Sequence, residues 1–146
     1  MSLTRCFPCL SLWARAAGLA TLTALAATAG AHDLTVEVLN ARSAQGTVDG
    51  ALYDDAATWL KTPRAGERQP AAERVLLVYR GLPAGRYALS VFHDENGNGK
   101  LDSNVAGVPT ERYGFSRDAR GHFSAPDFDA AAVDLQGDAS ITIHLR

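Results

Sequence analysis

The chain has 146 residues with 14 basic and 16 acidic side chains, giving a formal net charge of −2, and 47% of its residues are hydrophobic, enough for one buried core. With no basic run and no basic–aromatic cluster, this balance argues against nucleic acid as the partner, and the mild acidity argues against anionic lipid surfaces. The length suits one small domain with a short extension.

The N-terminal segment has the layout of a secretory signal peptide. Arg5 and Arg15 precede an uncharged apolar run of 12 residues, 16–27, and Ala29-Gly30-Ala31 follows as a small-x-small processing site. The run is shorter than the roughly 20 residues that span a bilayer. We therefore expect residues 1–31 to be removed, with an uncleaved anchor as the alternative. The mature chain, 32–146, is then a single domain that is exported to the periplasm or the extracellular space and is not inserted in a membrane.

Both cysteines, Cys6 and Cys9, lie within the segment that we expect to be removed. The mature chain then forms no disulfide, carries no thiolate nucleophile and makes no cysteine-ligated metal site. Loss of Arg5 and Arg15 also leaves 12 basic against 16 acidic residues, a net charge of −4. A small exported domain of this kind depends on its apolar core, with help from a metal if one binds.

From residue 34 onward, apolar and polar residues alternate as they do in strands that bury one face. The pattern predicts strands over 34–38, 48–52, 75–79, 87–91 and 141–145, and Gly81–Gly85 forms a tight connection rich in turn formers. No stretch has helical periodicity. We predict an all-β fold, an antiparallel β-sandwich of six to seven strands, transthyretin-like or immunoglobulin-like in plan. The predicted core residues are Val36, Val38, Leu77, Leu89, Val91, Ile141 and Ile143.

Between residues 54 and 72 the alternation breaks down, and Pro63, Gly66 and Pro70 are spread among charged residues. We predict a long loop here with one helical turn around 56–60. Trp59 and Leu60 in that turn either anchor the loop against the edge of the sandwich or form a lid over a ligand.

The stretch HDENGNGKLD, residues 93–102, places oxygen-bearing side chains at alternate positions. A calcium ion needs six to eight oxygen ligands, which a short chain supplies by curling tightly. Asp94, Asn96, Asn98 and Asp102 occupy positions 1, 3, 5 and 9 of the twelve-residue calcium loop. Gly99 stands at position 6, where the turn is sharpest, and Lys100 would contribute its carbonyl at position 7. This spacing predicts a calcium-binding loop.

One feature of that loop is missing, because position 12 is Val105 where such loops carry a bidentate glutamate. Two of the side-chain ligands are also neutral asparagines. Binding should therefore be weak, with a dissociation constant of roughly 10⁻⁴–10⁻³ M, unless Glu111 or Asp118 supplies the missing carboxylate. The alternative is a polar turn without a metal, since Asn-Gly occurs twice and is a strong turn signal.

Three segments closely resemble the bacterial DUF2141 family: 82–88 (LPAGRYA), 93–102 (HDENGNGKLD) and 107–116 (GVPTERYGFS), with 125–130 (APDFDA) similar to the family's late loop. This resemblance implies an exported protein of uncharacterised function. The 82–88 turn also resembles transthyretin-like and carboxypeptidase regulatory-like sandwiches, which are mostly accessory or binding modules. We expect a non-catalytic module for a protein or small-molecule ligand. Tyr113 and Phe115 form either a recognition surface beside the loop or a buried plug.

Two alternative functions remain open from the sequence. Cleavage after Ala31 would leave His32 as the first residue, whose amine and imidazole could bind copper together with His93, His122 or His144 and support an oxidoreductase. The chain also contains serine, histidine and aspartate, as a hydrolase requires, but no nucleophile-elbow motif frames any serine.

Overall fold

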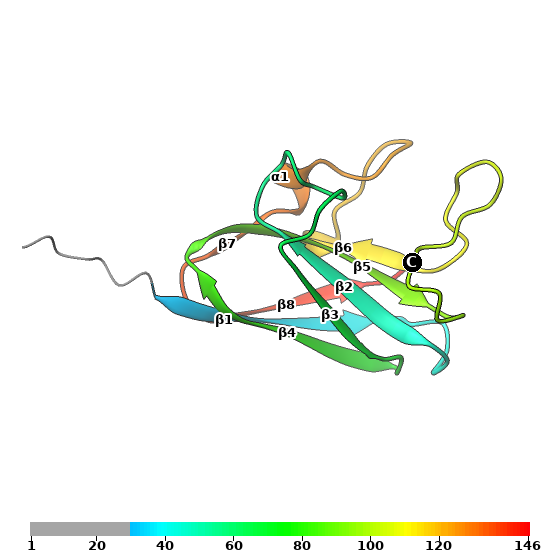
Figure 1. Ribbon diagram of the computed structural model, residues 1–146, viewed down its shortest axis with the longest axis horizontal. Helices are drawn as coiled ribbons and strands as arrows, with labels where there is room; N and C mark the ends of the chain where they lie inside the picture. The colour runs from blue at the N-terminus through cyan, green and yellow to red at the C-terminus, as the bar shows by residue number, and fades with distance from the viewer. Residues whose placement is uncertain (1–29) are drawn as a thin grey trace, which may run out of the picture.

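A computed structural model describes residues 30–146 (Figure 1), so the predicted signal peptide, 1–31, lies almost entirely outside the described residues. Eight strands and two single-turn helices make up this part of the chain. They are β1 (Ala31–Leu39), β2 (Thr47–Tyr53), β3 (Ala65–Pro70), β4 (Arg74–Pro83), β5 (Gly85–Asp94), β6 (Tyr113–Phe115), the 3-10 helix η1 (Ser116–Asp118), α1 (Phe128–Ala131), β7 (Val133–Leu135) and β8 (Ala139–His144). The all-β prediction is confirmed, with eight strands instead of six or seven. Within residues 30–146, no helix has the length and apolar character needed to cross a membrane.

The strands form two sheets that pack together as a sandwich (Figure 1). The first sheet has the order β4-β1-β8. The second has the order β3-β2-β5-β6, and β7 pairs with the first residues of β5. The chain crosses from the first sheet to the second at Ala84, between β4 and β5, where the sequence predicted a tight connection.

All strand pairs are antiparallel except β1 and β8, which run parallel from Leu34 and Ala139 onward. The reason is the place where β8 begins. β7 pairs with Gly85–Tyr87, at the same end of the sandwich where Ala31 of β1 pairs with Pro83. The short connection 136–138 delivers β8 to that end, so β8 runs in the direction of β1. Alternation in a sequence reports which face of a strand is buried and not the direction of its neighbour.

Three strands lie where the sequence predicted none. β3 occupies part of the expected loop 54–72 as an edge strand that pairs only with β2, and its residues are mostly exposed. It is held by backbone hydrogen bonds and by an ion pair between Arg68 and Asp49, and these need no apolar alternation. β6 and β7 have three residues each, too few to show an alternating pattern.

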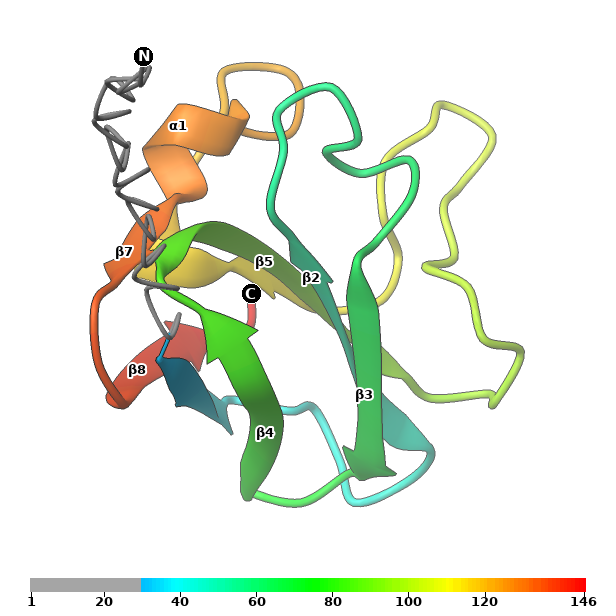
Figure 2. The same ribbon diagram turned by 60° about the vertical axis from the view of Figure 1, so that its left-hand side comes forward.

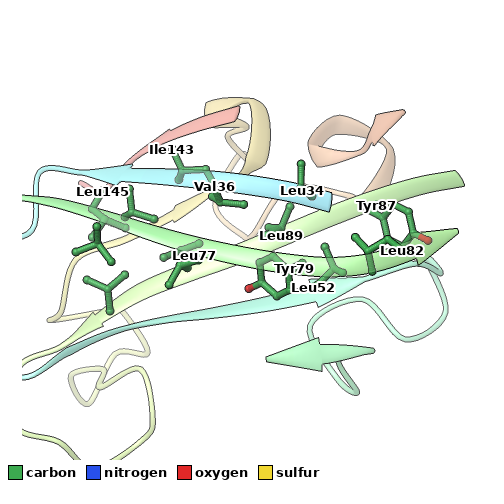
Figure 3. Packing of buried hydrophobic residues seen from close by; sticks show 14 of the residues in the cluster. Leu34, Val36, Leu52, Leu77, Tyr79, Leu82, Tyr87, Leu89, Ile143 and Leu145 are labelled. Atoms are coloured by element: carbon green, nitrogen blue, oxygen red, sulfur yellow. The ribbon is translucent and has the colours of Figure 1, made fainter. Parts of the chain in front are cut away.

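The interior between the two sheets is the main core (Figure 3). Six of the seven predicted core residues are buried there: Val36, Val38, Leu77, Leu89, Val91 and Ile143. Ile141 is only partly buried, because β8 is an edge strand whose outer residues cover the rim of the core. Leu34, Leu52, Tyr79 and Leu145 complete the centre of this cluster.

Close approach of the two sheets depends on Gly50 of β2. A Cβ atom at this position would lie 2.5 Å from Leu77 Cδ1 and 2.6 Å from the Tyr79 hydroxyl oxygen. No side chain fits there without displacing the facing sheet. The Tyr79 hydroxyl is buried against this glycine and has no hydrogen-bond partner among the described residues. Its burial raises the pKa of Tyr79.

A second apolar cluster lies on the outer face of the second sheet and is centred on Trp59. Its ring packs against Tyr53, Phe115 and Phe128, with ring centroids 5.0–6.1 Å apart, and its Nε1 donates to the Pro126 carbonyl at 2.8 Å. The anchoring role predicted for Trp59 is confirmed. Leu60, for which the sequence left an anchor or a lid open, is 41% exposed and does not share the anchoring role.

The turn around Trp59 also has the backbone that was expected. The N–H groups of Thr58 and Lys61 donate to the carbonyls of Asp55 and Thr58 at 3.2 and 2.9 Å, which makes one turn without a regular helix. Phe115 is buried as a plug, whereas Tyr113 is only partly buried beside it. The connections 54–64, 95–112 and 119–127 project on the same side of the molecule (Figure 2).

Candidate functional site

Asp94 ends β5 and is fully buried. One carboxylate oxygen, Oδ1, accepts from the N–H groups of Gly97 at 2.8 Å and Asn98 at 3.1 Å, and Oδ2 accepts from Gly99 N–H at 2.6 Å. Both glycines have φ near +73°, a conformation that glycine adopts at little cost. The chain therefore curls around the Asp94 carboxylate, an arrangement that both the calcium loop and the metal-free polar turn predict.

The same hydrogen bonds govern the ionisation of Asp94. Burial on its own raises the pKa of a carboxyl group, but the backbone donors at Gly99, Asn98 and Gly97, with the positive charge of Arg68, outweigh it and lower the pKa of Asp94 below its ordinary value. The group at the centre of the turn is thus an anion stabilised by backbone dipoles.

Asn96, Asn98 and Asp102 lie together across the turn. The side-chain Nδ2 of Asn96 donates to Asp102 Oδ2 at 2.6 Å, and that of Asn98 donates to Asp102 Oδ1 at 2.9 Å. Lys100 lies in the same turn, and its N–H donates to Asn98 Oδ1 at 2.8 Å. The side chains of three predicted metal ligands, Asn96, Asn98 and Asp102, therefore contact one another, whereas the carboxylate of Asp94 contacts backbone N–H groups of the same turn.

The sixth predicted ligand, Glu111, also reaches the turn, although it contacts backbone groups. Its side chain is buried, and its two oxygens accept from the N–H groups of Glu95 at 3.0 Å and Asp102 at 2.9 Å. Glu111 thereby fastens the two ends of the turn together. Asp118, the other candidate for the missing carboxylate, instead accepts from the His144 N–H at 2.9 Å and contacts His144 Nδ1 at 2.7 Å.

The side chains of the turn are of the chemical types that bind a hard cation, but in this structure they are not all oriented to bind one. Asp94 and Asp102 supply two carboxylates, and no group of three or more His, Cys, Asp or Glu side chains within residues 30–146 is arranged to hold a metal ion. The amide nitrogens of Asn96 and Asn98, and not their oxygens, face Asp102. Because the two ends of an asparagine amide have almost the same size, rotation of each amide would exchange nitrogen for oxygen.

The histidines proposed for a copper site are spread over the fold. His32 pairs with Leu82 at the start of β1, whereas His144 pairs with Leu39 at its end, about 20 Å away at the rise of a strand. His93 is buried at that far end, where Nδ1 accepts from Arg42 N–H at 3.2 Å and Nε2 lies 2.7 Å from the Gln45 carbonyl oxygen. His122 is exposed in the connection before α1.

Among the described side chains, one Asp–His pair lies at hydrogen-bond distance, Asp118 and His144. The 3-10 helix η1, which contains Asp118, offers this pair no serine nucleophile. Ser116 is fully buried, and its hydroxyl donates to the Ala131 carbonyl at 2.5 Å while accepting from Leu89 N–H at 2.9 Å. This serine therefore has a structural role that occupies its hydroxyl group.

A cavity of about 630 Å³ lies beside the 94–102 turn on the outer face of the second sheet. Its floor includes Tyr53, Phe92 and Tyr113, and its walls come from the three connections that project on this side. The sequence indicated only part of it, through the aromatic pair Tyr113 and Phe115. The remaining residues come from connections whose meeting point no sequence pattern reveals.

A family model described as "Uncharacterized protein conserved in bacteria (DUF2141)" matches residues 36–144. Searches of the curated proteins and of the solved structures give no match. The matched range runs from β1 to the last residue of β8 and includes the turn around Asp94.

Proposed function

The chain belongs to the DUF2141 family, and we propose that its mature form is an exported, non-catalytic binding module whose 94–102 turn binds calcium. The observation that carries this proposal is the cage around Asp94, in which three backbone N–H groups hold a buried carboxylate. Because these hydrogen bonds already hold the chain in its curled conformation, little conformational entropy remains to be lost when a cation binds. A cation then has to reorient side chains only.

In the bound form, Asp94 and Asp102 would supply carboxylate oxygens, Asn96 and Asn98 amide oxygens, and Lys100 its carbonyl oxygen. Calcium would supply a cross-link between the end of β5 and the segment that leads back to β6. Glu111 stabilises this arrangement from behind, because it holds Glu95 and Asp102 at the two ends of the turn. This role is structural and needs no chemical step.

Three features make the proposed binding weak. The turn offers two carboxylates beside neutral amides, the positive Lys100 lies within it, and Val105 at position 12 is fully exposed. A low ligand charge places calcium loops in the range of roughly 10⁻⁴–10⁻³ M. Such an affinity suits a compartment rich in calcium, in agreement with the proposed export.

The test is thermal unfolding of the mature protein, 32–146, in millimolar calcium and in chelator, with magnesium as the ionic-strength control. Calcium that binds only the folded protein adds RT ln(1 + [L]/Kd), about 1.4 kcal/mol at tenfold excess over Kd, which corresponds to a rise of a few degrees in Tm. Calorimetric titration should give the matching Kd.

Asp102→Asn is the most informative variant, because it removes one negative charge while keeping a side-chain oxygen. In this variant the calcium-dependent rise in Tm should disappear. Asp127→Asn is the matched control, since Asp127 is exposed and its side chain caps no helix. It should keep the full rise. Equal melting of the unmutated protein in calcium and in chelator would leave a metal-free polar turn as the answer.

The proposed export has its own test. Mass spectrometry of the protein purified from its native host should give a first residue at or near His32, after processing at Ala29-Gly30-Ala31. An intact Met1 in the extracytoplasmic fraction would show an uncleaved anchor, and recovery only from the cytoplasm would contradict export. A first residue other than His32 also removes the copper alternative, which requires a free amine on that histidine.

A further inference from the structure

The cavity of about 630 Å³ on the outer face of the second sheet is adjacent to the 94–102 turn, but none of the proposed calcium ligands lines it. Cross-strand pairing places Phe92 of β5 opposite Tyr113 of β6, and Ser90 opposite Phe115. These four side chains form a continuous floor that faces away from the main core. Leu60, Val108 and Phe123 rise around it from the three projecting connections.

Among residues 30–146, no charged side chain lines this cavity. Its lining from within residues 30–146 consists of aliphatic and aromatic side chains, glycine, proline and the hydroxyl-bearing residues Tyr53, Ser90, Tyr113 and Ser124. A ligand with a net charge would lose water here without gaining a counter-charge, at a large cost in free energy. Planar amides and carboxylates, which bind the many hydroxyl groups of a sugar, are also absent from this lining. The cavity therefore suits an uncharged and mostly apolar ligand.

Tyr53 contributes one of the hydroxyl-bearing side chains of the lining. The residue is 95% buried, with a relative exposure of 5%, and its ring is held edge-on against Trp59. It nevertheless lines the cavity. A tyrosine hydroxyl at this position could donate a hydrogen bond to a ligand atom or accept one from it.

The rim of the cavity exposes large apolar side chains that have no role in the core. Phe123 is fully exposed and Val108 is 56% exposed. Phe123 and Leu60 both have positive φ, +62° and +57°, a conformation that is unfavourable for bulky residues. Apolar groups gathered at the mouth of a cavity of this size are typical of small-molecule sites.

We propose that this cavity binds an uncharged, mostly apolar small molecule that contains an aromatic or similarly flat ring and one or two hydrogen-bonding groups. The flat rings of Phe92 and Tyr113 provide the apolar surface, and the hydroxyls of Tyr53 and Ser90 provide the polar contacts. The proposal goes beyond calcium binding and does not depend on it, because none of the proposed calcium ligands lines the cavity.

The test uses two fluorescent probes that share one ring system. N-phenyl-1-naphthylamine is neutral and apolar with a single N–H, and 1-anilinonaphthalene-8-sulfonate carries an added negative charge. The neutral probe should bind the mature protein at one site with a blue-shifted, enhanced emission, and the sulfonate should bind at least about tenfold more weakly. Equal binding of both probes, or no binding of the neutral probe, would overturn the proposal.

A pair of variants on one connection locates the site. Val108→Asp places a charge at the mouth of the cavity and should weaken binding of the neutral probe by about tenfold or more. Val105→Asp places the same charge three residues away, at a fully exposed position outside the lining, and should leave binding unchanged. Both positions are exposed, so both variants should fold, as circular dichroism and melting will show. Equal effects of the two substitutions would overturn the proposal.

Every titration is run in calcium and in chelator. Binding of the neutral probe in both conditions supports the site whether or not calcium raises Tm, and its absence in both defeats the site even where calcium raises Tm. Sedimentation velocity at two protein concentrations supplies the last outcome. If the apolar rim associates with a second copy of the chain and Val108→Asp abolishes that association, the surface is a dimer interface and the proposed ligand site is wrong.

Discussion

The core between the sheets and the turn around Asp94 are both well packed, but different forces hold them. In the core, apolar side chains such as Leu34, Leu77 and Leu89 are fully buried, and their packing is insensitive to pH and to dissolved ions. In the turn, two buried carboxylates, Asp94 and Glu111, accept hydrogen bonds from five backbone N–H groups. Shape limits substitution in the first region, and charge limits it in the second.

Gly50→Val tests the importance of shape in the core and should have the largest effect. The added side chain would collide with Leu77 and the Tyr79 hydroxyl, so we expect a loss of about 3 kcal/mol or more in the free energy of unfolding, measured by urea denaturation. Gly66→Ala is the matched control, because a Cβ there meets only the Gly50 carbonyl oxygen at 3.8 Å, an ordinary contact. A similar loss in both variants would mean that strand flexibility, and not sheet spacing, sets the requirement for glycine.

Asp94→Asn tests the importance of charge in the turn, with an effect that depends on pH. In chelator at neutral pH the variant should lose about 1–3 kcal/mol, the worth of hydrogen bonds to a charged acceptor. The pKa of Asp94 is lowered in the folded protein from a reference value of 3.8. Its contribution is therefore complete above the unfolded-state pKa and is lost as pH falls through the folded-state pKa.

The Tm difference between Asp94→Asn and the unmutated protein should thus be constant from about pH 7 to pH 5 and should narrow below about pH 4. For Asp118, burial opposes the shift, but hydrogen bonds from His144 lower its pKa as well. Asp118 is present in both proteins, so its titration cancels in the difference. A Tm difference that widens in acid would contradict the assigned role of the Asp94 carboxylate.

Tyr79→Phe should have the smallest effect and the opposite sign. The Tyr79 hydroxyl is buried without a hydrogen-bond partner in the described part of the chain. Its removal should raise the free energy of unfolding by up to about 1 kcal/mol, because an unsatisfied buried polar group is lost while the ring packing stays. Tyr87→Phe is the control, since its hydroxyl donates to the Pro83 carbonyl at 2.8 Å, and this variant should be destabilised. Destabilisation of Tyr79→Phe would indicate a buried water on that hydroxyl.

The difference between apolar packing in the core and hydrogen bonding elsewhere explains which parts of the fold were predictable from the sequence. Alternation marked the strands that bury one face against the core, and six of seven predicted core residues are buried. It could not reveal β3, whose exposed residues are held by backbone pairing and the Arg68–Asp49 ion pair. It also could not reveal the direction of β8, which depends on where β7 ends.

For the candidate site, short-range spacing was informative and long-range contacts were not. The register of Asp94, Asn96, Asn98 and Asp102 predicted their convergence because a nine-residue segment curls locally. The contacts of Glu111 with Glu95 and Asp102 depend on the return of the chain toward β6. The cavity depends on three connections meeting over one sheet face, and their lengths and compositions do not specify that meeting.

The parallel pairing of β1 with β8 affects the order in which the fold can be completed. Leu34 pairs with Ala139, 105 residues later, so one edge of β1 has no partner until β8 has been synthesised. Closing so long a loop is entropically costly, and contacts of high sequence separation slow folding. Until the last strand arrives, β1 presents an open row of backbone donors and acceptors, the kind of edge on which chains aggregate. Pairing with β8 therefore covers an edge of β1 that would otherwise be open to association, as well as completing the first sheet.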